Sequence, residues 1–252
     1  MATWSSKRKF VYAILAIIIV AAAVGLPAWK ILYVPPSCTD ARQNGDEQGI
    51  DCGGSCTKVC QNAFLPLPSP SWVRFKQIVS NSYNAAAYIV NPNPKAGAKS
   101  IPYTFDMLDA NGLSLSHISG SFDIAPGRNT VVFAGPFILK TQAPVRTIFT
   151  IDRDPVWYVG NDPLPSLTVA DKDYSEATTS SSLTVTLKNT GALPIPALNV
   201  YAILNDEDGN VVDFSRTLVD GIQPGGTAAA PFTWPYGHFG KVISIEVVSV
   251  PE

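Results

Sequence analysis

All four cysteines of this 252-residue chain lie in one short segment, CTDARQNGDEQGIDCGGSCTKVC. An even number of closely spaced cysteines is typical of disulfide bonding in an oxidising compartment. Zinc is a poor alternative, because no histidine lies nearby and the cysteine spacing does not match a structural zinc site. We predict two disulfides and leave their three pairings open, since the spacing does not choose among them. The residues involved are Cys38, Cys52, Cys56 and Cys60.

Oxygen-bearing side chains alternate with glycines in the same segment. Calcium prefers several oxygen ligands on a tightly turning backbone. The sequence therefore offers a candidate calcium site, although its spacing does not match an EF-hand loop. The alternative is a solvated acidic turn held by the disulfides, and no other cofactor is expected. The candidate ligands are Asp40, Asn44, Asp46, Glu47 and Asp51.

The two histidines, His117 and His238, stand apart from each other in the sequence. A catalytic histidine needs a nucleophile and an orienting group within reach. The chain contains no G-x-S-x-G, H-E-x-x-H, P-loop or dinucleotide-binding motif. We therefore predict no catalytic residues and do not expect an enzyme.

Four large side chains fall within six residues of a predicted late loop, WPYGHF. Pro235 and Gly237 favour an exposed turn there, and aromatic residues are enriched at binding hot spots. We predict that replacing Trp234 and Tyr236 weakens partner binding without unfolding the module. The candidate partner-binding residues are Trp234, Tyr236, His238 and Phe239.

An uncharged apolar run extends from Phe10 to Trp29. At about 1.5 Å per residue it is long enough to cross the roughly 30 Å hydrocarbon core of a bilayer as one helix. The basic residues 7–9 before it predict a cytoplasmic N-terminus, with residues 31–252 outside the cytoplasm. A cleaved signal peptide is the alternative, with Ala21 and Ala23 as small residues near a cleavage site. We favour an uncleaved signal-anchor, because the run continues past Ala23.

The predicted exported part is mildly acidic. Four of the 18 Lys and Arg lie at the anchor and none of the 20 Asp and Glu do, which leaves 14 cations, 20 anions and a formal charge of −6. Nucleic-acid grooves and surfaces that bind anionic lipid need clustered cations. The composition argues against both kinds of partner.

Beyond a proline-rich stretch at 61–71, the chain repeats itself at an offset of 97 or 98 residues. The run 87–91 corresponds to 185–189, 101–112 to 198–209, and 124–127 to 222–225. With a looser match of 134–137 to 230–232, this register extends over some fifty residues and indicates two copies of one module. The predicted boundaries are a cytoplasmic tail at 1–9, an anchor helix at 10–29, a disulfide segment at 38–60, a linker at 61–71, module 1 at 72–153, a linker at 154–166 and module 2 at 167–252.

Apolar and polar residues alternate in both copies, for example along 183–188. This is typical of antiparallel strands with one buried and one wet face. Asn111-Gly112 and Asp208-Gly209 favour hairpin turns. The predicted fold is mainly β, with two tandem immunoglobulin-like sandwiches of about seven strands each behind a transmembrane helix. Trp157 and Tyr158 are expected to pack between the modules.

Two resemblances support this interpretation. The cysteine segment is similar to a C-x-D-G…N-G-x-E-x-x-x-D-C-G-G-x-C-x-x-C cassette of secreted and surface proteins of bacteria, with Ala41 in place of a glycine and a longer final gap. The second copy, with Lys188-Asn189, the turn 206–209 and Pro224-Gly225, resembles bacterial FxLYD and CARDB immunoglobulin-like modules. These resemblances imply an extracellular spacer and an adhesion, scaffold or interaction module.

The sequence therefore predicts a single-pass, non-catalytic protein of the cell envelope, facing the cell surface or periplasm. Its expected role is structural or adhesive, with other envelope proteins as partners. A subunit of an envelope or secretion assembly is one alternative, because Ala21, Ala22, Ala23 and Gly25 could allow close helix packing. An accessory subunit to an enzyme encoded elsewhere is another.

Overall fold

The computed structural model describes residues 4–32, 37–139, 142–238 and 241–252. The chain divides into two compact units, Met1–Cys60 and Gln61–Glu252. The division coincides with the predicted end of the disulfide segment at residue 60. Each unit is described by itself below.

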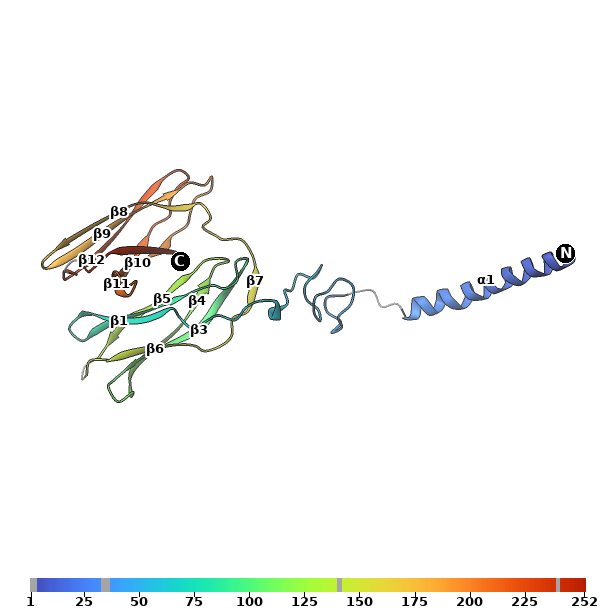
Figure 1. Cartoon of the computed structure of the whole chain (residues 1–252), viewed down its shortest axis with the longest axis horizontal. Coiled ribbons are helices and arrows are strands. Elements are labelled where there is room, and N and C mark those ends of the chain that lie inside the picture. The colour runs from blue at the N-terminus through green and yellow to red at the C-terminus, as the bar shows by residue number, and fades with distance from the viewer. Residues whose placement is uncertain (1–3, 33–36, 140–141, 239–240) are drawn as a thin grey trace. The chain divides into compact units, whose positions relative to one another are not determined.

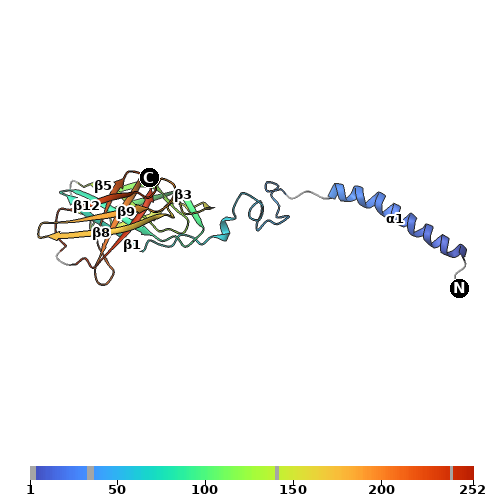
Figure 2. The same cartoon turned by 90° about the horizontal axis from the view of Figure 1, so that it is seen from above.

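The first unit begins with helix α1 (Trp4–Leu32), which Figure 2 shows as one continuous helix. Its section Lys9–Pro27 has a mean hydropathy of 2.6 and none of it is buried within the protein. Phe10 is 69% exposed and Ile17 is 68% exposed. Apolar side chains that cover every face of a helix need an apolar environment. Length and composition suit a membrane anchor, and a signal sequence would share these properties.

The described part of the second unit contains one short 3₁₀ helix and thirteen strands. They are η1 (Gln61–Ala63), β1 (Trp72–Val79), β2 (Ser82–Ile89), β3 (Ala96–Leu108), β4 (Ser114–Ile124), β5 (Thr130–Ile138), β6 (Arg146–Ile151), β7 (Trp157–Val159), β8 (Leu167–Ala177), β9 (Ser180–Asn189), β10 (Leu198–Asn205), β11 (Val211–Val219), β12 (Thr227–Trp234) and β13 (Ser244–Pro251).

The first seven strands form a sandwich of two sheets with antiparallel pairing. One sheet has the order β1-β2-β5, and the other has the order β4-β3-β6 with β7 paired to β3. Alternate residues of β3, including Ile101, Phe105 and Met107, point into the core between the sheets, where each is at most 1% exposed. This burial is the main stabilising term for the sandwich.

The last six strands form a second sandwich, with sheets β11-β10-β13 and β12-β9-β8. In β9, Leu183, Val185 and Leu187 are fully buried while Thr184 and Lys188 face outward. This strand has the predicted one-face-buried pattern. The mainly β fold with immunoglobulin-like sandwiches is therefore confirmed.

The four sheets of residues 61–252 lie as successive layers (Figure 1), because the outer face of β1-β2-β5 packs on the outer face of β11-β10-β13. A third apolar cluster fills this contact, which we call the inter-sandwich interface. Strands β2 and β10 are consequently buried on both faces, so the expectation of one wet face is wrong for them. The buried cluster residues are Ala86, Tyr88, Val131, Tyr201, Ile203, Phe214 and Val248.

The two predicted linkers are integrated into the first sandwich. Strand β7 lies inside the predicted linker 154–166, and Trp157 is 5% exposed in the first core, in contact with Phe64. The expected packing of Trp157 between the modules is therefore wrong. In the segment 61–71, Asn93 exchanges two hydrogen bonds with the backbone of Leu65, and Gln61 exchanges two with the backbone of Trp157. These bonds fix the entry of the chain into the sandwich.

Candidate functional site

The cysteine segment is held by two disulfides, Cys38–Cys56 and Cys52–Cys60. None of the four cysteines is free. The segment has little regular structure, and an isolated bridge between Gly49 and Cys52 is its one strand-like pairing. The predicted bonding of all four cysteines is confirmed, and the structure selects one of the three pairings.

The acidic side chains of this segment are engaged with its own polar groups. Asp51 accepts hydrogen bonds from the amides of Asp40 and Ala41, and Glu47 accepts one from the amide of Asn44. The Ser55 hydroxyl donates to Asp46 at 2.7 Å, and this bond lowers the pKa of the Asp46 carboxyl. The carboxylates therefore brace the turns that the disulfides close.

The five predicted calcium ligands do not converge on one point among the described residues. The one group of three acidic or sulfur ligands found there is Cys38, Glu47 and Cys56, and its two sulfurs are joined in a disulfide. The amide oxygen of Asn44 is buried without a hydrogen-bond partner in the described structure. Calcium binding by this segment stays a prediction.

We expect reduction to unfold the disulfide segment and leave both sandwiches intact, because all four cysteines lie before residue 61. Alkylation without reduction should modify no cysteine, as measured by intact mass. After reduction, thermal unfolding of the sandwiches followed by tryptophan fluorescence should shift by less than about 2 °C. A loss of the sandwich transition on reduction would contradict this division of the chain.

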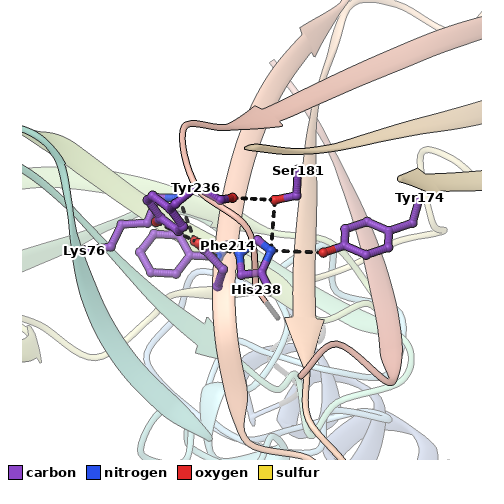
Figure 3. A network of polar contacts seen from close by, with 7 residues as sticks. Lys76, Tyr174, Ser181, Phe214, Tyr236 and His238 are labelled. Atoms are coloured by element: carbon purple, nitrogen blue, oxygen red, sulfur yellow. Dashed lines mark hydrogen bonds and ion pairs between the residues drawn. The ribbon is translucent and has the colours of Figure 1, made fainter. Parts of the chain in front are cut away.

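A charged cluster lies at the inter-sandwich interface and is drawn in Figure 3. Lys76 of β1 forms an ion pair with Asp213 of β11, with Nζ 2.6 Å from Oδ1. Asp213 is 4% exposed and also accepts the Tyr236 hydroxyl at 2.8 Å and the Phe214 amide at 2.6 Å. Burial lowers the pKa of Lys76, and the Asp213 carboxylate opposes that shift. The buried Asp213 carboxylate, which also contacts His238, therefore links the two sandwiches.

Three aromatic rings surround the Lys76 ammonium. Its Nζ lies 5.7 Å from the ring centroids of Phe214 and Trp234 and 6.0 Å from that of Tyr236. Cations are attracted to ring faces at about 6 Å or less. Trp234 and Tyr236, both from the predicted late loop, thus contact a lysine of the first sandwich.

The cluster continues into the second sandwich through His238, which is 5% exposed. Its Nε2 lies 3.1 Å from Asp213 Oδ2, and its Nδ1 lies 2.9 Å from Ser181 Oγ and 3.0 Å from the Tyr174 hydroxyl (Figure 3). With the proton on Nε2, the imidazole donates to Asp213 and accepts from a hydroxyl at Nδ1. The ring ties β8, β9 and β11 together.

Serine, histidine and aspartate are also the residue types of a hydrolytic triad. In a triad the serine oxygen must reach a substrate, whereas Ser181 is 3% exposed and its hydroxyl donates to the Tyr236 carbonyl at 3.0 Å. The arrangement therefore positions strands, and Ser181 is not presented as a nucleophile. His117 lies on the exposed face of β4, away from this cluster.

The structure contradicts the prediction of an exposed aromatic loop at two of its four residues. Trp234 ends β12 and is 1% exposed in the second core, where it stacks on Phe232 and meets His238 edge-on. His238 is buried as described above, and Tyr236 is 36% exposed. Phe239 lies outside the described residues. The alternating pattern Phe232, Trp234 along a strand was the sequence signal for burial.

Further polar contacts involve residues of both sandwiches. Arg128 pairs with Asp162 and donates to the carbonyl of Leu164. The Tyr88 hydroxyl donates to Glu246 at 2.6 Å, and burial together with this bond raises the pKa of Tyr88 to about 12. The Tyr88–Glu246 bond adds a second polar contact to the inter-sandwich interface.

A cavity of about 340 Å³ opens beside the charged cluster. Its walls include Arg74, Lys76 and Asp213, with Tyr236, His238 and Lys241 facing them. Sequence reasoning did not find this site, because its members are far apart in the chain: Lys76 and Asp213 are separated by 137 residues. No local spacing connects them.

Comparison with known proteins gives one family match. No match was found among curated proteins. Among solved structures, a β-glucuronidase of glycoside hydrolase family 2 is 11% identical over 68% of this chain and 24% of its own, with a TM-score of 0.24. A Bacteroides uniformis β-glucuronidase is 12% identical over 61% of this chain and 21% of its own, with a TM-score of 0.22. Red sea bream transglutaminase is 12% identical over 71% of this chain and 31% of its own, with a TM-score of 0.23. This chain spans less than a third of each, and such weak likeness says nothing of its activity.

The family match falls on the second sandwich. Residues 164–252 match the family described as CARDB, which begins three residues before the predicted module boundary at 167. Leu164, the first matched residue, is 1% exposed in the core of this sandwich. Residues 164–252 therefore form an immunoglobulin-like module of the CARDB type.

Proposed function

We propose that this protein is a membrane-anchored, extracytoplasmic interaction protein of the cell envelope, with a structural or adhesive role and no catalytic activity. The observation that carries the proposal is helix α1, whose 19-residue apolar section has no buried residue. The disulfide segment supports an oxidising compartment beyond the helix. The basic residues 7–9 before the helix support a cytoplasmic N-terminus.

The proposal includes two copies of one module in tandem. Asn91 and Asn189 each donate from Nδ2 to two backbone carbonyls and accept from the amide two residues later. Asp109 and Asp206 each accept from the amides two and four residues later. Equivalent contacts at an offset of 97 or 98 residues support a repeat. Two modules packed as one body would hold a binding surface in a fixed orientation.

Protease treatment of intact spheroplasts tests the membrane topology. We expect the sandwiches to be digested from outside while a tag before Met1 survives in the cytoplasm. Intact mass should show that residues 10–29 remain attached to the exported part. Protection of the sandwiches would contradict the orientation, and release of a chain lacking residues 10–29 would establish a cleaved signal sequence instead.

A subunit of an envelope or secretion assembly is the second candidate function, with an accessory subunit to an enzyme as a related form. Gly25 favours it, because a side chain at this position would meet no atom of this chain within 4 Å. Small residues on an apolar helix allow a second helix to approach closely. Isolation from detergent-solubilised membranes should then give a complex of fixed stoichiometry that Gly25→Leu disrupts. Recovery of the chain alone would contradict the assembly role and favour the adhesive role.

A further inference from the structure

A groove of about 610 Å³ lies between the two sandwiches. Pockets for small ligands have volumes of this order and combine apolar walls with a few polar groups. Side chains of both sandwiches line it, from β3, β4 and β5 on one side and from β10, β11 and β13 on the other. Five aromatic rings contribute to its walls: Tyr103, Phe122, Phe133, Tyr158 and Tyr201.

Two cations face this groove from opposite sandwiches. The Arg216 guanidinium lies 4.8 Å from the centroid of the Phe133 ring, and Lys99 Nζ lies 6.0 Å from that of Tyr158. Within the described part of the chain, neither cation has a carboxylate within 4.0 Å. Aromatic contacts thus orient both charges without neutralising them.

The remaining polar groups complete the site. Tyr201 is 7% exposed and lines the groove, and the positive charge of Arg216 opposes the rise that burial causes in the pKa of Tyr201. The planar guanidinium fork of Arg216 matches the geometry of a carboxylate. Two carboxylates also line the groove: Asp123 accepts the Ser100 amide at 2.8 Å, and Glu252 lies at the rim.

We propose that this groove binds an acidic saccharide. The carboxylate of the saccharide lies between Arg216 and Lys99, and the flat C–H face of the sugar ring packs on one of the half-buried rings, Phe122 or Tyr158. Asn161 and Asn199 also line the groove. Their side-chain amides form hydrogen bonds with sugar hydroxyls, because an amide both donates and accepts. An acidic peptide would satisfy the cations but would leave the ring faces without a flat apolar partner. This inference rests on the proposed interaction role and names its ligand class.

Titration calorimetry with the full chain in detergent tests the groove. The probes are tetramers of galacturonate and of alternating glucuronate and N-acetylglucosamine, a methyl-esterified tetragalacturonate, and hexaglutamate as the acidic peptide. We expect at least one acidic saccharide to bind and its neutral ester to bind at least tenfold more weakly. Arg216→Gln and Lys99→Gln should each weaken binding about tenfold or more, while Lys188→Gln, a change of an exposed lysine on β9, should not.

Thermal melts of the variants separate loss of the site from loss of the fold, and Arg216→Lys keeps the charge while removing the planar fork. Absence of binding to both acidic saccharides would overturn the proposal, as would equal binding of the acid and its ester. Binding of hexaglutamate alone would assign the groove to a peptide. None of these outcomes affects the topology and assembly tests. The saccharide proposal can therefore be overturned while the proposed role as a membrane-anchored interaction protein stands.

Discussion

Replacing Asp213 by alanine is expected to lower the free energy of unfolding by about 3–5 kcal/mol. Asp213 is 4% exposed and accepts from Lys76, Tyr236 and the Phe214 amide, besides its contact with His238. The alanine would leave a lysine ammonium, at 18% side-chain exposure, opposite no negative charge. Urea unfolding of the full chain in detergent, followed by tryptophan fluorescence, measures the loss.

A matched pair of controls shows whether the loss comes from the unpaired charge. Asp171→Ala removes an exposed carboxylate on β8 and should change stability by less than about 0.5 kcal/mol. The double change Lys76→Met with Asp213→Leu should recover the part of the loss that comes from the unpaired lysine charge, because apolar residues of similar size can replace a buried ion pair, whereas Tyr236 and His238 still lack their acceptor. A cost below about 1 kcal/mol for Asp213→Ala would mean that Lys76 escapes to water and that the pair does not hold the interface.

Replacing Trp234 by alanine is expected to cost about 3–5 kcal/mol and to unfold the second sandwich first. The indole is 1% exposed, stacks on Phe232 with centroids 6.3 Å apart, and forms one wall of the pocket around the Lys76 ammonium. Its removal leaves a cavity in the core and exposes one side of the charged cluster. The melting temperature of the second sandwich, followed by circular dichroism, is the direct measurement.

Two smaller changes at the same place separate packing from hydrogen bonding. Trp234→Phe keeps a ring and removes an indole N–H that has no partner in the described structure, so it should cost less than half as much as the alanine. Tyr236→Phe removes only the bond to Asp213 and should cost about 1 kcal/mol. An unchanged melting temperature in Trp234→Ala would restore the idea that this ring serves an external partner.

The packing of the two sandwiches has a direct consequence for the groove. The inter-sandwich interface combines an apolar cluster with the Lys76–Asp213 and Tyr88–Glu246 contacts. The groove lined by Arg216 and Lys99 is formed by both sandwiches, so its shape depends on these contacts.

Sequence alone determined the features that depend on neighbours in the chain. The apolar run 10–29 predicted the helix, because every residue of a membrane-length helix must be compatible with an apolar environment. Alternation along 183–188 predicted strand β9 with one buried face, and the crowding of four cysteines predicted that all would be bonded. The residues Lys188-Asn189, the turn 206–209 and Pro224-Gly225 pointed to the CARDB type that the family match supports.

Only the tertiary structure decided what depends on residues far apart in the sequence. Strands β2 and β10 are buried on both faces because their two sheets pack outer face to outer face. The residue pattern of a single strand does not show which other sheet covers its second face. Lys76 meets Asp213 across 137 residues, so no spacing rule links them. Trp234 continues the alternation of β12 into the core of the second sandwich, where burying an indole is more favourable than exposing it to water.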